Sequence, residues 1–243
     1  MYTYVHGGDI YSEKLAPTGK PFIDFSANIN PLGLPASVKK AVQESLKQCV
    51  NYPDPFCRDL RKATADFLNV KPEYLFFGNG AADCLFRLAV ALKPKNALVL
   101  APTFADYEKA LKTVDCKIKY YELKESHDYK VGEDILNKIT VRTDIVVICN
   151  PNNPTGQLTD RNIMNAILER CHEVGAYLLI DECFMDFIDM PREYTMIKAL
   201  ARNKSLIILK AFTKTFAMPG IRLGYLMTSN SGLISNLYEA GQD

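Results

Sequence analysis

Seven short apolar runs follow one another along this chain, and patterns typical of amphipathic helices lie between them. The runs occupy residues 74–77, 97–101, 118–123, 144–149, 177–181, 206–210 and 224–228. Several of them are apolar throughout, as expected for strands that are covered on both faces of a sheet. Alternation of strands and helices favours a doubly wound, mostly parallel sheet. The sequence therefore predicts an α/β fold.

The helical patterns are expected to form the layers that cover this sheet. They lie near residues 35–47, 56–68, 80–92, 104–114, 131–138, 159–173 and 193–202. In the segment 159–173 the apolar side chains fall on one face, and Thr159 can serve as the N-cap. The first part of the chain differs, because it is loop-rich up to Pro35 and then predicts a single helix.

Composition narrows the class of protein. The chain has 243 residues, of which 48% are apolar and 23% are charged, the balance of a globular protein with a substantial core. A net charge of +1 gives no electrostatic reason to expect nucleic acid or membrane partners. Seven cysteines are scattered without a CxxC pair, which argues against a disulfide framework or a zinc site and favours a reducing cytoplasm. The N-terminus lacks a signal-peptide pattern, and no apolar run is as long as a membrane span.

Polar and glycine-rich segments directly follow several of the apolar runs. Residues 78–80 (Gly-Asn-Gly) follow the first run, and residues 150–156 (NPNNPTG) follow the fourth. Asp181 closes the fifth run, and Lys214 lies shortly after the sixth. In a doubly wound sheet, ligands bind outside the carboxyl ends of the strands. We therefore expect these segments to form a binding site.

The segment 211–225 (AFTKTFAMPGIRLGY) resembles the lysine signature of class I and II aminotransferases, fold-type I enzymes that use pyridoxal 5'-phosphate (PLP). A lysine after a strand is otherwise a solvated surface residue. The step from Lys214 to Arg222, followed by Leu-Gly-Tyr, makes the match specific. The resemblance implies that Lys214 forms a Schiff base with PLP and that Arg222 binds its phosphate, with Thr213 as an additional hydroxyl donor.

Asp181 and the loop 150–156 match two further parts of the family pattern. PLP needs a carboxylate that keeps its pyridine nitrogen protonated and a hydrogen-bond donor to its 3-oxygen. The resemblance assigns these roles to Asp181 and Asn153, and Pro154 is expected to shape the loop through a cis bond. Without the resemblance, Asp181 is equally consistent with a helix cap and the loop with a turn.

Three other parts of the chain complete the site that the resemblance implies. Gly80, Ala81 and Ala82 open a helix after a strand, and in the family this turn presents backbone N–H groups to the PLP phosphate. Phe104 occupies the ring-stacking position and is otherwise a core aromatic. Tyr52 matches a tyrosine that reaches the phosphate of the neighbouring subunit, which implies a homodimer; it is otherwise a turn residue.

The resemblance extends over residues 1–243 and implies a three-layer α/β/α large domain with a mostly parallel sheet. Residues 1–47 match the N-terminal arm and helix, which belong to the small domain in the family, and residues 48–243 match the PLP-binding large domain. The C-terminal small domain of the family, with the arginine that holds the substrate carboxylate, is expected to be absent. A catalytically silent PLP-binding fragment is therefore one hypothesis for this chain.

Within the family, the chain resembles threonine-phosphate decarboxylase of cobalamin biosynthesis and histidinol-phosphate aminotransferase. Residues 6–10 (HGGDI) and 24–33 (DFSANINPLG) resemble the decarboxylase. Phe184 stands where the aminotransferase has a tyrosine that donates to the 3-oxygen. The resemblance implies decarboxylation of L-threonine O-3-phosphate to an aminopropanol phosphate, with His6 and Asn30 as candidate contacts to the substrate phosphate.

The alternative reaction is amino transfer, with histidinol phosphate or an aromatic amino acid as the donor. Lys214 and Asp181 serve both reactions, so they do not discriminate between them. Phe184 is also consistent with a plain core residue, and His6 with a bystander near the terminus. Both reactions therefore stay open at the level of sequence.

Overall fold

A computed structural model describes residues 7–8, 10 and 24–241. Its sheet has seven strands in the order β1-β7-β6-β5-β4-β2-β3. The strands are β1 (Leu75–Gly78), β2 (Asn96–Ala101), β3 (Lys117–Glu122), β4 (Ile145–Cys149), β5 (Tyr177–Asp181), β6 (Leu206–Ala211) and β7 (Gly224–Met227). β7 pairs antiparallel with both β1 and β6, whereas the pairs from β6 to β3 are parallel. The predicted mostly parallel α/β sheet is confirmed.

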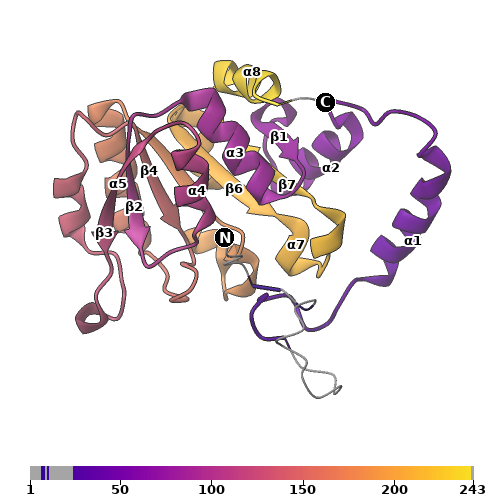
Figure 1. Ribbon diagram of the computed structural model, residues 1–243, viewed down its shortest axis with the longest axis horizontal. Coiled ribbons are helices and arrows are strands. Elements are labelled where there is room, and N and C mark those ends of the chain that lie inside the picture. Colours follow the sequence, from indigo (N-terminus) through magenta and orange to yellow (C-terminus); the bar gives the residue numbers. More distant parts are fainter. Residues whose placement is uncertain (1–6, 9, 11–23, 242–243) are drawn as a thin grey trace, which may run out of the picture.

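Helices cover both faces of the sheet, which gives three layers (Figure 1). One face packs against α3 (Ala81–Leu92), α4 (Asp106–Lys112) and α8 (Ser231–Glu239). The other face packs against α2 (Arg58–Leu68) and α5 (Arg161–Val174). Side chains alternate between these two cores along each strand, as a pleated strand requires. The remaining helices are α1 (Ala36–Ser45), α6 (Pro191–Tyr194) and α7 (Phe212–Thr215).

Short 3-10 helices make up most of the other connections. They are η2 (Leu46–Gln48), η3 (Pro72–Tyr74), η4 (Glu125–His127), η5 (Glu133–Lys138), η6 (Met185–Phe187), η7 (Ile197–Arg202) and η8 (Pro219–Ile221). The sequence predicts one helix at 131–138 and another at 193–202. The structure instead has the 3-10 helix η5 in the first segment, and in the second the end of α6 followed by the 3-10 helix η7. In the second case the chain leaves α6 at Thr195, whose hydroxyl donates to buried Glu182 at 2.6 Å. Met196 N donates to the same carboxylate at 2.9 Å, and this tertiary contact interrupts the helix.

Helix α8 was not predicted from the sequence, although its local signals are present. Asn230 caps it by accepting a hydrogen bond from Leu233 N. Leu233, Ile234 and Leu237 are buried against the same face of the sheet as α3. Its apolar positions follow the helical period, but they come after the last of the apolar runs, where the sequence predicts no further element.

The N-terminal segment, of which residues 24–48 are described without a gap, is bonded to α7, the short helix that follows β6. In Figure 1, α1 stands away from the body of the molecule, and none of its side chains is buried. Asn30 N donates to Lys214 O at 3.1 Å, and Asn30 Nδ2 donates to Thr215 O at 2.9 Å. These two bonds fasten the N-terminal segment to the short helix that carries Lys214.

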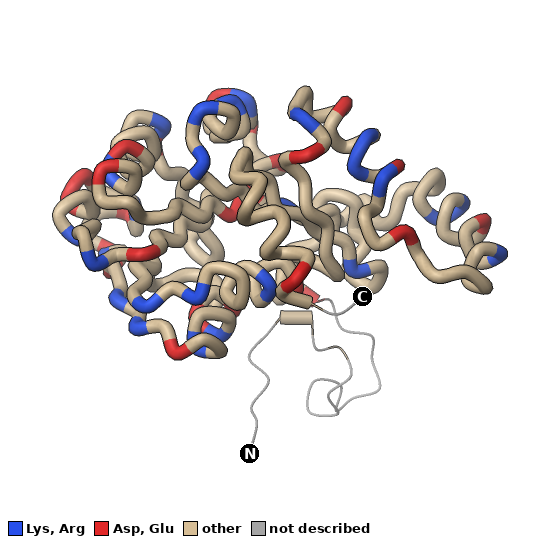
Figure 2. Tube along the Cα trace, turned by 90° about the horizontal axis from the view of Figure 1, so that it is seen from above, with Lys and Arg blue, Asp and Glu red and all other residues tan. Residues whose placement is uncertain are grey.

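Positively and negatively charged residues are mixed along the described chain. Lys and Arg are interspersed with Asp and Glu along the tube in Figure 2, in line with a net charge of +1. Among the described residues, no helix combines the length and the apolar character needed to cross a bilayer.

Gly224 sets how closely β7 approaches the start of α3, and we expect Gly224→Ala to destabilise the fold. A Cβ at this position would lie 2.5 Å from Ala81 N and 2.6 Å from Gly80 C, both of which are backbone atoms that cannot turn aside. Overpacking of this kind costs about 1–3 kcal/mol, measurable as a lower urea midpoint at unchanged m-value. Gly232→Ala is the matched control, since its Cβ would meet only Asn230 Oδ1 at 3.5 Å. Equal stability of the two variants would contradict the prediction.

Candidate active site

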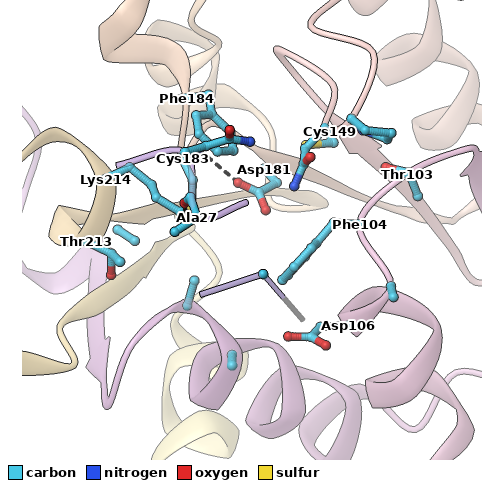
Figure 3. A pocket seen from close by; sticks show the side chains of 18 of the residues that line it. Ala27, Thr103, Phe104, Asp106, Cys149, Asp181, Cys183, Phe184, Thr213 and Lys214 are labelled. Carbon is cyan, nitrogen blue, oxygen red and sulfur yellow. Dashed lines mark hydrogen bonds between the residues drawn. The ribbon is translucent and has the colours of Figure 1, made fainter. Parts of the chain in front are cut away.

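A cavity of about 350 Å³ lies beyond the carboxyl ends of the parallel strands (Figure 3). The last residues of β4, β5 and β6, which are Cys149, Asp181 and Ala211, all line it. The following residues with predicted roles line this cavity: Ala81, Ala82, Phe104, Asn153, Asp181, Thr213, Lys214 and Arg222. Segments far apart in sequence thus meet at one edge of the sheet, where doubly wound folds bind ligands.

Lys214 points into this cavity from α7, directly after β6. Its ammonium group donates a hydrogen bond to the carbonyl oxygen of Ala27 and lies 5.9 Å from the centre of the Phe184 ring. Burial lowers the pKa of the Lys214 amine, and the charge of Arg222 lowers it further, while Cys183 and Asp181 act in the opposite direction. A lowered pKa leaves more of the amine neutral at physiological pH, the form that attacks a carbonyl carbon.

Asp181 is a buried carboxylate, with 5% of its surface exposed, and both its oxygens accept hydrogen bonds. Tyr107 donates its phenol O–H to Oδ2 at 2.6 Å, and the backbone N–H of Cys183 donates to Oδ1 at 2.8 Å. Burial raises the pKa of Asp181, and the bonds from Cys183 and Tyr107 counteract part of that rise. Figure 3 shows the carboxylate facing the same space as Phe104 and the end of Lys214.

Gly80 and Arg222 form the opposite end of the site, at the N-terminus of α3. Gly80 is the N-cap of this helix, with φ 89° and ψ 169°, a conformation that is essentially restricted to glycine. A Cβ there would lie 2.5 Å from Arg222 Nη2, so the guanidinium group rests directly against the glycine. The start of a helix and an arginine together form an environment suited to a phosphate. Thr213 adds a hydroxyl to the cavity lining.

Asn152 holds the loop 150–156 against the residues that follow β2. Its Oδ1 accepts from Thr103 Oγ1 at 2.8 Å, and its Nδ2 donates to Pro102 O at 3.1 Å. The neighbouring Asn153 lines the cavity, and the peptide bond between Asn153 and Pro154 is cis, as predicted. Asn153 therefore lines the cavity because its neighbour Asn152 anchors the loop.

Three predicted residues of the described chain do not line the cavity: Gly80, Tyr52 and Asn30. Tyr52 is fully exposed, with a relative accessibility of 101%. Asn30 lies beside α7, where its amide donates to Thr215 O and accepts from Leu32 N. His6 lies outside the described residues.

Sequence reasoning missed four residues of the site: Thr103, Tyr107, Asn152 and Cys183. Tyr107 was detectable in principle, because it lies three residues after Phe104, in the first turn of the helix that follows. Thr103 and Asn152 carry no local signal, since they bind each other across 49 positions, and Cys183 binds Asp181 through a backbone N–H that most residue types provide. Among the described residues there is no group of three or more His, Cys, Asp or Glu side chains that could hold a metal ion.

Comparison with known proteins finds relatives for almost the whole chain. The family model described as "Aminotransferase class I and II" matches residues 20–242. The threonine-phosphate decarboxylase of Salmonella typhimurium is 37% identical over 239 residues, which are 98% of this chain and 65% of that protein. The histidinol-phosphate aminotransferase of Caldicellulosiruptor saccharolyticus is 32% identical over 93% of this chain and 63% of that protein.

Solved structures resemble the chain over the same region. The crystal structure of the histidinol-phosphate aminotransferase from Clostridium acetobutylicum superposes with a TM-score of 0.83 at 31% identity, covering 91% of this chain and 65% of that one. The L-threonine-O-3-phosphate decarboxylase from Porphyromonas gingivalis gives a TM-score of 0.75 at 22% identity, which supports the fold alone. The chain spans about 63–65% of the length of the curated relatives named above.

Proposed function

We propose, from the premise that this chain belongs to the class I and II aminotransferase family, that its cavity binds PLP and that the protein decarboxylates L-threonine O-3-phosphate. The observation that carries the proposal is the convergence of Lys214, Asp181 and Arg222 on one cavity at the carboxyl end of the sheet. Members of the family use PLP as cofactor. An amine, a buried carboxylate and an arginine at a helix start are the groups that PLP requires.

The residues of the cavity fit the parts of PLP one by one. The Lys214 amine is placed to bind the aldehyde carbon, and Arg222 with the backbone of Gly80 is placed to hold the phosphate. Asp181 suits the protonated pyridine nitrogen, because it is buried and, within the described part of the chain, forms no ion pair. Asn153 is placed to donate to the 3-oxygen.

Two aromatic side chains and three smaller groups complete the binding site that we propose. Phe104 is positioned to stack on the ring, and Phe184 lines the cavity near Lys214. Ala81 and Ala82 contribute backbone N–H groups at the start of α3, and Thr213 contributes its hydroxyl.

Bound PLP supplies an electron-withdrawing ring that stabilises negative charge on the carbon next to the substrate amine. Asp181 maintains that property by keeping a negative charge at the ring nitrogen. Lys214 provides the amine that exchanges with the amine of the substrate and then carries a proton to that carbon. These residues serve decarboxylation and amino transfer alike, so the choice of reaction depends on how the substrate is oriented.

Decarboxylation of a phosphorylated amino acid is the reaction that the comparisons favour. The alignment with the Salmonella decarboxylase covers 98% of this chain at 37% identity. Phe184 supports the same choice, because it lines the cavity at the position of the aminotransferase tyrosine and cannot donate a hydrogen bond. Asn30 is a candidate contact for the substrate phosphate, since it is bonded to the backbone of the lysine helix. His6 is a second candidate contact.

Amino transfer from histidinol phosphate is the second candidate function. It is favoured by the TM-score of 0.83 to the Clostridium acetobutylicum aminotransferase and by the 32% identity to the curated relative from Caldicellulosiruptor. A PLP-binding chain without turnover is the third candidate.

Product analysis on the protein expressed from its own gene separates these functions. With threonine phosphate as substrate, we expect release of carbon dioxide that does not require 2-oxoglutarate. Release of an amino group to 2-oxoglutarate, with histidinol phosphate as donor, would instead establish the aminotransferase. Cofactor bound covalently without either product would support the silent fragment.

Self-association is also part of the proposal. Several apolar side chains of the N-terminal part are largely exposed: Phe25 (85%), Leu32 (90%), Val50 (87%) and Tyr52 (101%). Their exposure is compatible with burial against a second copy of the chain. We infer a homodimer in which Tyr52 reaches the phosphate of the neighbouring subunit. We also infer a cytoplasmic protein, which is supported by free thiols at all seven cysteines.

A further inference from the structure

We propose that Tyr107 is a positioning residue, whose phenol O–H holds the Asp181 carboxylate in the orientation that meets the pyridine nitrogen of PLP. This inference rests on the proposed cofactor site and assigns a role to a residue that contributes no group to the family signature quoted above. The bond from Tyr107 to Asp181 Oδ2 measures 2.6 Å and joins residues that are 74 positions apart in the chain.

The Tyr107 side chain has little freedom to make any other contact. It lies in the first turn of α4, is 2% exposed and packs in the core between α3 and the sheet. Its ring meets the ring of Phe104 edge to face, with centroids 5.6 Å apart and planes at 80°. One turn of chain therefore supplies both the proposed stacking ring and the hydroxyl that binds Asp181, so the distance between these two groups is fixed locally.

Asp181 is held from two sides, and the two contacts together fix the plane of its carboxylate. Tyr107 binds Oδ2 from α4, and Cys183 N binds Oδ1 from the loop after β5. A carboxylate with a donor on each oxygen cannot rotate without breaking one of those bonds. Its remaining lone pairs are then available to a ligand in the cavity, which Asp181 lines.

The Tyr107 hydroxyl orients the Asp181 carboxylate, and it also favours the ionised form of that carboxylate. Burial raises the pKa of Asp181, and the bonds from Cys183 and Tyr107 together with the charge of Lys214 oppose that rise. The thiol of Cys149 also faces this cluster. Burial and the charge of Asp181 raise the pKa of Tyr107, which keeps its O–H protonated and donating. Removing this donor raises the pKa of Asp181, so the carboxylate takes up a proton at a higher pH.

Tyr107→Phe tests the inference, because it removes the hydroxyl and keeps the ring. We expect PLP affinity near neutral pH to fall roughly tenfold, the usual scale for a hydrogen bond to a charged group. We also expect the acid limb of the affinity profile to move to higher pH, since Asp181 is then neutralised earlier. Binding is followed by the visible absorbance of the cofactor between about pH 5 and 9. Borohydride should still trap the cofactor on Lys214, which separates failure of this inference from failure of the proposed site.

Tyr121→Phe is the matched control. Tyr121 also donates to a carboxylate, Asp134 Oδ1, at 2.6 Å, but neither residue lines the cavity. This variant should lose a similar bond and leave the affinity and its pH profile unchanged. An equal effect of the two substitutions would mean that Tyr107 acts only through stability.

A double-mutant cycle with Asp181→Ala asks whether Tyr107 acts through Asp181. In the Asp181→Ala background the hydroxyl has no carboxylate to orient, so Tyr107→Phe should change the affinity less than twofold. A further tenfold loss in that background would overturn the inference. An unchanged affinity and acid limb for Tyr107→Phe alone, with cofactor still trapped on the wild-type chain, would also overturn it.

Discussion

Lys214→Ala is expected to abolish covalent attachment of PLP to this chain. Of the lysines in the described part of the chain, only Lys214 lines the cavity. Burial lowers the pKa of its amine there. Without this amine, no bond to the aldehyde carbon can form at the site. The measurement is borohydride reduction of the chain with PLP, followed by mass spectrometry of its peptides.

Lys204→Ala is the matched control for this experiment. Lys204 is exposed, lies before β6 and does not line the cavity. The control should retain the label on the peptide that contains Lys214. Stoichiometric labelling that persists in Lys214→Ala would exclude Lys214 as the attachment site, and absence of label in the wild-type chain would exclude the cofactor proposal itself.

Gly80→Ala is expected to weaken PLP binding by roughly tenfold to a hundredfold. An added Cβ would lie 2.5 Å from Arg222 Nη2 and 2.9 Å from Cζ, so the guanidinium group must shift from its position against the glycine. Charge-assisted hydrogen bonds to a phosphate contribute about 1.5–3 kcal/mol, which sets the size of the loss. The backbone at φ 89° and ψ 169° adds about 1–3 kcal/mol of strain to the folded state. Affinity is measured by cofactor absorbance and stability by urea unfolding.

Gly175→Ala separates backbone strain from displacement of Arg222. Gly175 also has a positive φ, of 76°, but nothing lies within 4 Å of the Cβ that would be added. This variant should therefore lose stability and keep full affinity for PLP. If Gly80→Ala loses no more affinity than Gly175→Ala, Arg222 does not bind the phosphate.

Most strands of this fold could be predicted because they are buried apolar runs; the edge strand β3, with only Tyr121 buried, is the exception. A strand covered on both faces needs apolar side chains at every position, so the pattern is visible without knowledge of its neighbours. β4 and β6 are buried at all their positions and fall within the predicted runs 144–149 and 206–210, with Ala211 added to β6. The helices were less predictable where a tertiary contact interrupts them, as the Thr195 hydroxyl does by binding Glu182.

The sequence by itself determined the residues that are close along the chain. The resemblance of segment 211–225 and of NPNNPTG to the family pattern singled out the lysine, the arginine and the asparagine, and those residues do line one cavity. Their relation to Asp181 also followed from sequence, because the carboxyl ends of parallel strands meet at one edge.

Only the tertiary structure decided which groups support those residues. Tyr107 and Asp181 are 74 positions apart, and Thr103 and Asn152 are 49 apart. Such bonds depend on the order of strands in the sheet and on side-chain directions, and neither leaves a periodic signal in the sequence. Lys214, which first indicated a cofactor, could therefore be recognised from residues close to it in the sequence. The orientation of the carboxylate opposite it depends on packing between elements that are distant in the chain.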